Sequence, residues 1–179
     1  MPCYFVGVYW GERPEAREVC AKRIAAFLGG LASEDPALSH WYRKAASRKA
    51  AMESVPLDLD GLASLLRTSS RDLDGGTMNE LGFHFSAWNG RDESLSASVG
   101  VTCGAHDSSV KNSAVLTFTP TSQPSQHLLQ RVLRAAVLAF APNHGVVTTA
   151  EAVASCPQVP VWEAPASFRY GNASGFSSE

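Results

Sequence analysis

Residues 80–104 read ELGFHFSAWNGRDESLSASVGVTCG, and this stretch decides the fold. Apolar and polar residues alternate along both of its arms, 81–87 and 95–103, which flank an Asn-Gly pair and a charged tip. Successive side chains of a strand point to opposite faces, so a period of two predicts strands with one buried face. The Asn-Gly pair predicts that the two arms form an antiparallel hairpin.

The segments around this hairpin predict its neighbours and its cover. Aromatic and β-branched residues predict three further strands at 3–10, 113–119 and 145–149, the last of them at an edge of the sheet. Apolar residues at every third or fourth position predict helices at 15–32, 58–67 and 125–140. We expect the last helix to pack on the inner face of the sheet. The fold class is therefore α+β, with a mainly antiparallel sheet, built on hairpin 80–104 and its flanking strands, packed against several helices.

The remaining segments predict less regular structure. Residues 38–52 are expected to form a short irregular or helical piece that carries Trp41 and Tyr42 inward, and 68–77 an exposed polar loop. No internal repeat or domain boundary is visible. We expect a single domain at 1–170, followed by a flexible polar tail at 171–179.

Length and charge limit the possible functions. A chain of 179 residues with 45% hydrophobic content can bury a sizeable core. The net charge of −2 gives no overall electrostatic attraction to nucleic acid or to anionic membranes. However, residues 56–110 carry three basic and eight acidic residues. This acidic excess is either a solvated face or part of a partner-binding surface.

The cysteines and the apolar runs predict a cytoplasmic protein. The four cysteines are scattered and include no Cys-x-x-Cys pair, which favours reduced thiols. The N-terminus has no basic region and no cleavage site of a signal peptide. The longest apolar run, at 135–141, is far below the roughly 20 residues of a membrane span. We therefore expect no membrane association.

A search for catalytic motifs finds one weak candidate. Phosphate-binding loops, nucleophile elbows and His-x-x-x-His spacings are absent from the sequence, so no metal or cofactor is predicted. Cys103, His106 and Asp107 are the right types for thiolate catalysis. Yet Cys103 falls on the same face of its predicted strand as the apolar residues, which predicts a buried structural cysteine. A small enzyme using Cys103 and His106 stays an alternative.

Trp88 is the aromatic residue that points most directly to a partner. It falls on the polar face of the predicted hairpin, as His84 does, and it lies next to the charged tip in the sequence. A half-exposed tryptophan of this kind suits a protein-binding hot spot. The other interpretation is that Trp88 packs under a nearby loop, and the sequence leaves both open.

Four sets of short motifs follow one another along the first two-thirds of the chain. They are Tyr9-Trp10-Gly11; Trp41-Tyr42-Arg43-Lys44; Leu81-Gly82-Phe83 with Trp88-Asn89-Gly90; and Ser98 to Cys103-Gly104 with Asn112-Ser113. In order and spacing this set resembles the immunity protein 52 family, over about residues 4–120. Members of that family are inhibitors in bacterial polymorphic-toxin and type VI or contact-dependent secretion systems, paired with toxins that carry a restriction-endonuclease-like domain. The resemblance implies an immunity-type domain that binds a nuclease toxin in the producing cell and has no catalytic residues of its own.

The charge pattern is compatible with such a partner. A nuclease presents a basic cleft, so carboxylates on an inhibitor give complementary potential and faster encounter. The candidate toxin contacts are Asp72, Asp74, Trp88, Asn89, Arg91, Asp92, Glu93 and Asp107. We expect the loops that carry them to cluster at one end of the sheet. Two alternatives stay open: contact through the basic segment 41–49 with an acidic toxin surface, and a regulatory adaptor unrelated to toxins.

Overall fold

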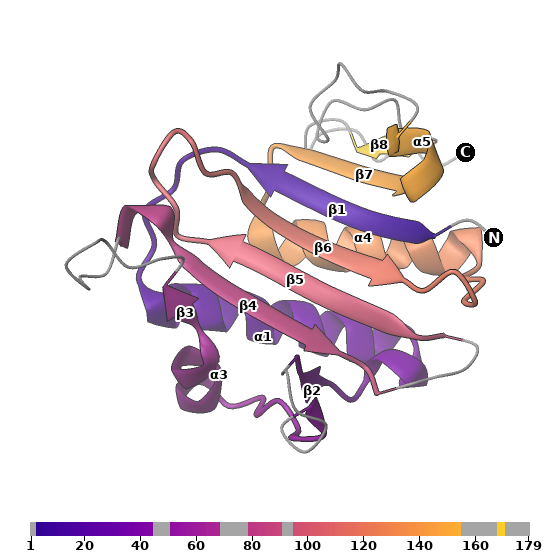
Figure 1. Cartoon of the computed structure of the whole chain (residues 1–179), viewed down its shortest axis with the longest axis horizontal. Helices are drawn as coiled ribbons and strands as arrows, with labels where there is room; N and C mark the ends of the chain where they lie inside the picture. The colour runs from indigo at the N-terminus through magenta and orange to yellow at the C-terminus, as the bar shows by residue number, and fades with distance from the viewer. Residues whose placement is uncertain (1–2, 45–50, 69–78, 91–94, 155–167, 171–179) are drawn as a thin grey trace.

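A computed structural model of the chain describes residues 3–44, 51–68, 79–90, 95–154 and 168–170 (Figure 1). Eight strands form one sheet in the order β2-β4-β5-β6-β1-β7-β8, with β3 also paired to β4, and every pairing is antiparallel. The strands are β1 (Tyr4–Trp10), β2 (Tyr42–Arg43), β3 (Arg67–Thr68), β4 (Phe83–Trp88), β5 (Ala97–Cys103), β6 (Asn112–Phe118), β7 (His144–Thr149) and β8 (Phe168–Tyr170). The helices are α1 (Arg17–Glu34), η1 (Pro36–Leu38), α3 (Leu59–Leu65), η2 (Asn79–Leu81), α4 (Gln126–Phe140) and α5 (Ala150–Ala154).

The central hairpin forms as predicted. Strands β4 and β5 pair with Phe83 opposite Cys103 and Trp88 opposite Ser98. Along β5 every second residue, from Ala97 to Cys103, is buried, and the residues between them are half-buried. The period of two in the sequence therefore reports one face that meets the core and one that does not.

Helices α1 and α4 cover one face of the sheet and lie behind it in Figure 1. They pack on each other and fill the core with large apolar side chains, among them Phe27 and Phe140. Helix α4 begins where the hydroxyl of Ser125 accepts a hydrogen bond from the backbone N–H of Leu128 (3.1 Å). It ends at Ala141, whose backbone is left-handed (φ 45°). The α+β class and the helix on the inner face are confirmed, and no helix of the described residues lies over β4, β5 and β6 on the opposite face (Figure 1).

One expectation about strands is wrong, and another is incomplete. The segment predicted as an edge strand forms β7, but β7 lies between β1 and β8 and is therefore internal. The piece expected to be irregular or helical contains β2, in which Tyr42 pairs with Trp88. Trp41 is buried as predicted, whereas Tyr42 is only half-buried. In both cases a partner strand distant in the sequence supplies the pairing, which local periodicity cannot show.

Several expectations fall outside the described residues. They include the polar loop after Thr68 and the tail at 171–179. Within the ranges that the structure does describe, no helix has both the length and the apolar character needed to cross a membrane.

Candidate functional site

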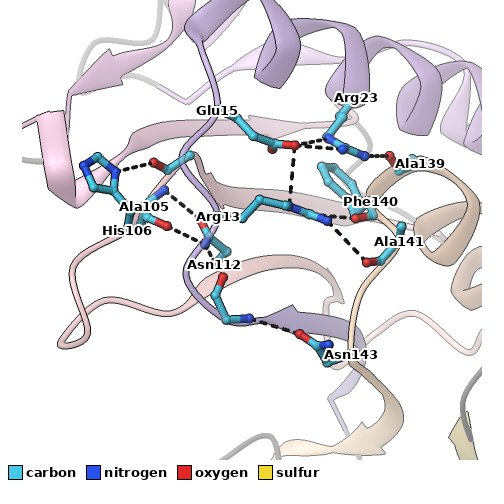
Figure 2. Close-up of polar contacts among 12 residues, drawn as sticks. Arg13, Glu15, Arg23, Ala105, His106, Asn112, Ala139, Phe140, Ala141 and Asn143 are labelled. Atoms are coloured by element: carbon cyan, nitrogen blue, oxygen red, sulfur yellow. Dashed lines mark hydrogen bonds and ion pairs between the residues drawn. The ribbon is translucent and has the colours of Figure 1, made fainter.

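A partly buried charge cluster joins the start of α1 to the end of α4 (Figure 2). The carboxylate of Glu15 lies 2.7 Å from Arg23 and 3.5 Å from Arg13. Arg13 donates a hydrogen bond to the carbonyl of Phe140 (2.7 Å), and Arg23 donates one to that of Ala139 (3.0 Å). Burial lowers the pKa of Arg13, and Glu15 opposes that shift. Because these arginines satisfy the free carbonyls of a helix C-terminus, the cluster is structural.

Asn112 holds the loop between β5 and β6 in place through side-chain hydrogen bonds. Its side chain is fully buried, and its amide nitrogen donates to the carbonyls of Gly11 (2.7 Å) and Ala105 (2.9 Å). Its amide oxygen accepts from the backbone N–H of Ala105 (2.9 Å), as Figure 2 shows. This asparagine therefore positions the loop that carries Asp107.

Asp107 lies on that loop as an accessible carboxylate. The backbone N–H of Ser109 (2.8 Å) and its hydroxyl both donate to the carboxylate. Both hydrogen bonds lower the pKa of Asp107 below its usual value, and the one from the Ser109 hydroxyl has the larger effect. The backbone N–H of Asp107 donates to the carbonyl of Glu80 (3.0 Å), which ties the loop to the start of β4. Asp107 is thus held in its charged form at a fixed place.

Trp88 is half-buried at the other end of β4. Its indole N–H donates to the carbonyl of Ala51 (3.0 Å), and its ring lies 6.1 Å from that of Tyr42. Trp88 also lines a surface hollow. Trp88 therefore packs against its own protein and also borders the surface. Its role as a toxin contact stays a prediction.

Asn89 is a structural residue, which corrects its place among the candidate contacts. Only 3% of it is exposed. Its amide nitrogen donates to the carbonyls of Leu95 (2.7 Å) and Ala37 (3.2 Å), and its amide oxygen accepts from the N–H of Ala97 (2.9 Å). The amide hydrogens and the amide oxygen of Asn89 already form hydrogen bonds within the protein, which leaves little hydrogen-bonding capacity for a partner.

The other candidate contacts lie outside the described residues: Asp72, Asp74, Arg91, Asp92 and Glu93. The residues that flank them are described, however. Thr68 pairs at the start of β4, and Asn79 begins η2 just before it, at the same end as Asp107. Gly90 and Leu95 lie beyond the far end of β4.

The described flanks of these segments differ from the expectation that the loops lie at one end of the sheet. At about 3.3 Å per residue, β4 separates its two ends by roughly 17–20 Å. Because the hairpin returns the chain, Gly90 and Leu95 lie at the end of β4 opposite to Asp107. The contribution of each acidic residue to toxin binding stays a prediction.

Cys103 lacks the features of a catalytic thiolate. It is fully buried, and the hydrogen bond with Cys20, together with burial, raises the pKa of its thiol. The Nδ1 atom of His106 lies 3.3 Å from the carbonyl oxygen of Gly104. A reactive cysteine needs the opposite shift, and the prediction of a buried structural cysteine is confirmed. In the part of the chain that the structure describes, no three His, Cys, Asp or Glu side chains gather in a way that could hold a metal ion.

The sequence did not identify a hollow of about 480 Å³ on the face without helices. Residues of β2, β4, β5 and β6 line it, Arg43 and Gly100 among them, together with Lys44 and with Leu65 of α3. A second hollow, of about 400 Å³, shares Lys44 and continues to Trp88. The available signal was Gly100, because a glycine inside a strand often marks a close approach of another molecule.

Comparison with known proteins assigns the chain to a family. A search of curated proteins gave no match. A family model described as Immunity protein 52 matches residues 2–167. This span extends well beyond the motifs of residues 4–120 and includes α4 and strands β1 to β7. The chain therefore belongs to the Immunity protein 52 family.

Proposed function

We propose that this protein binds a nuclease toxin of a type VI or related polymorphic-toxin system and neutralises it in the cytoplasm of the producing bacterium. The observation that carries the proposal is the match to the Immunity protein 52 family over residues 2–167. Immunity requires a complex with the toxin. The toxin's nuclease activity follows from the resemblance described above.

Inhibition proceeds by surface complementarity, without chemistry by the protein's own side chains. The best candidate nucleophile, Cys103, is buried and has a raised pKa. The surface in contrast offers an ionised carboxylate at Asp107 and a half-buried aromatic ring at Trp88. These groups suit recognition of a basic protein surface with an aromatic anchor.

We propose that the toxin contacts Trp88, Arg91 and the carboxylates at both ends of the sheet. Asp107 lies at the first end, near the described flanks of the segment with Asp72 and Asp74. The described flanks of the segment with Asp92 and Glu93 lie at the second end. Because the two ends are far apart, one of them can dominate the contact. Their contributions have to be measured separately.

The experiment measures the affinity for the nuclease encoded beside this chain, at low and high salt. One variant replaces Asp72, Asp74 and Asp107 with Asn, and a second replaces Asp92 with Asn and Glu93 with Gln. Glu18→Gln, on the exposed side of α1, is the control. We expect at least one of the two variants to bind about tenfold or more weakly and with less salt dependence. Full affinity in both would reject the acidic contact, and no binding by the wild type would reject the function.

A further inference from the structure

The two hollows on the face without helices meet at Lys44, and we call them together the sheet groove. The groove runs beside β2 and across the outward side of β4 and β5. Its walls are built mainly of small or hydroxyl-bearing residues with two basic residues at the side: Arg43, Lys44, Ser86, Ser98, Gly100 and Thr102. Among the described elements, no helix crosses β4 and β5 on this face (Figure 1), and Leu65 of α3 borders the first hollow.

The groove has a one-sided charge. No Asp or Glu lines either hollow within the described residues. Lys44 is exposed and forms no ion pair with any carboxylate there. Arg43 pairs with the exposed carboxylate of Glu53 (2.6 Å), which compensates its charge. Among the described lining residues, Lys44 therefore offers a positive charge without an ion-pair partner, and this charge attracts acidic groups.

The edge of the sheet excludes one kind of occupant. Strand β3 pairs with the first two residues of β4, and β2 pairs with its last two. Only Phe85 and Ser86 lie between them on this edge. Two residues are too few for a partner strand to add to the sheet by extended pairing. The groove can instead accept a loop that inserts its side chains.

Gly100 provides the space for such a loop. It lies in the middle of β5, and a Cβ atom built on it would have no neighbour within 4 Å. Its φ is outside the left-handed region, so other residues are compatible with its backbone. Glycine is thus required here neither by the backbone nor by packing within the described chain.

We infer that the sheet groove receives an acidic loop of the toxin, with Lys44 facing its carboxylates. This inference rests on the proposed function and adds a contact of opposite sign to the proposed acidic contacts. A surface that combines both signs fixes the orientation of the partner and rejects partners with only one of them.

The test fills the groove without unfolding the protein. Gly100→Gln places a neutral side chain in the open space, and Gly29→Gln, at an exposed and equally open position of α1, is the matched control. Affinity is measured against the adjacent nuclease, and stability by urea unfolding. We expect Gly100→Gln to weaken binding by about tenfold or more while both variants stay as stable as the wild type.

Charge reversal gives an independent measurement. Lys44→Glu should weaken binding by about tenfold at low salt and by less at high salt. Lys22→Glu changes the charge equally at an exposed position of α1 and should leave affinity unchanged.

The outcomes separate the inference from the proposed function. Wild-type affinity in both Gly100→Gln and Lys44→Glu would overturn the inference and leave the function standing. A change in oligomeric state with unchanged toxin affinity would assign the groove to a second copy and also overturn it. Marked destabilisation by Gly100→Gln would assign it to a segment of this chain, with the same consequence. If the wild type does not bind the nuclease, the proposed function itself is wrong.

Discussion

The carboxylate of Glu15 lies 2.7 Å from the guanidinium of Arg23, although only 8% of the Glu15 side chain is exposed. Arg23 also donates to the carbonyl of Ala139, so the pair links the start of α1 to the end of α4. These are the two helices that cover the sheet. The ion pair therefore contributes to the position of the whole helical layer.

We predict that Glu15→Gln lowers the free energy of unfolding by about 1–3 kcal/mol. The change removes the charge that compensates Arg23 and Arg13 while it keeps the size of the side chain. Urea unfolding measures the effect, and Glu18→Gln on the exposed side of α1 serves as the control. Equal stability of the two variants would show that the cluster does not connect the helices.

We predict that Asn89→Ala destabilises the protein by about 2–4 kcal/mol, because the buried N–H of Ala97 loses its acceptor and two carbonyls lose a donor. The fraction that remains folded should bind the toxin with wild-type affinity. Urea unfolding and a binding titration below the transition measure both quantities. Reduced affinity at full stability would restore Asn89 as a contact residue.

We predict that Cys103 makes stability fall at alkaline pH. Its folded pKa is raised, so its contribution is complete below the unfolded pKa, about 8.5, and declines as pH rises above that value. Unfolding measured between neutral and alkaline pH should show a smaller decline in Cys103→Ala than in the wild type. Identical pH profiles would contradict a raised pKa at this thiol.

We predict that Asp107→Asn weakens toxin binding about three- to tenfold at low salt and by less at high salt. Asparagine retains an oxygen that can accept the hydrogen bonds of Ser109, so the loop keeps its conformation and only the charge is lost. Asp60→Asn, at an exposed position of α3, is the control. Affinity equal to the wild type at low salt would remove Asp107 from the contact.

Local sequence patterns were enough for the hairpin and for the two long helices. The alternation along β4 and β5 and the apolar stripe of α4 depend on which side chains face the core, and periodicity reports that directly. Strand β2 and the internal position of β7 could not be found in this way. Both depend on pairing with residues far away in the sequence.

The candidate site was predicted less well for the same reason. Asparagine is a residue type that suits protein contacts. The side-chain amide of Asn89, however, forms hydrogen bonds with three backbone groups that only the folded chain brings together. The acidic residues form one group in the sequence, whereas the described residues that bound their segments lie at both ends of β4. Gly100 was visible as a glycine in a strand, yet its meaning depends on the open space above it.

The central claim is inhibition by stoichiometric binding, and a titration of nuclease activity tests it most directly. The adjacent nuclease is held at a concentration far above the dissociation constant while this protein is added in steps. The account predicts a linear loss of activity that ends at a fixed molar ratio, with a complex of that ratio recovered by gel filtration. Complete inactivation by a small fraction of that amount, or no inhibition at all, would contradict it.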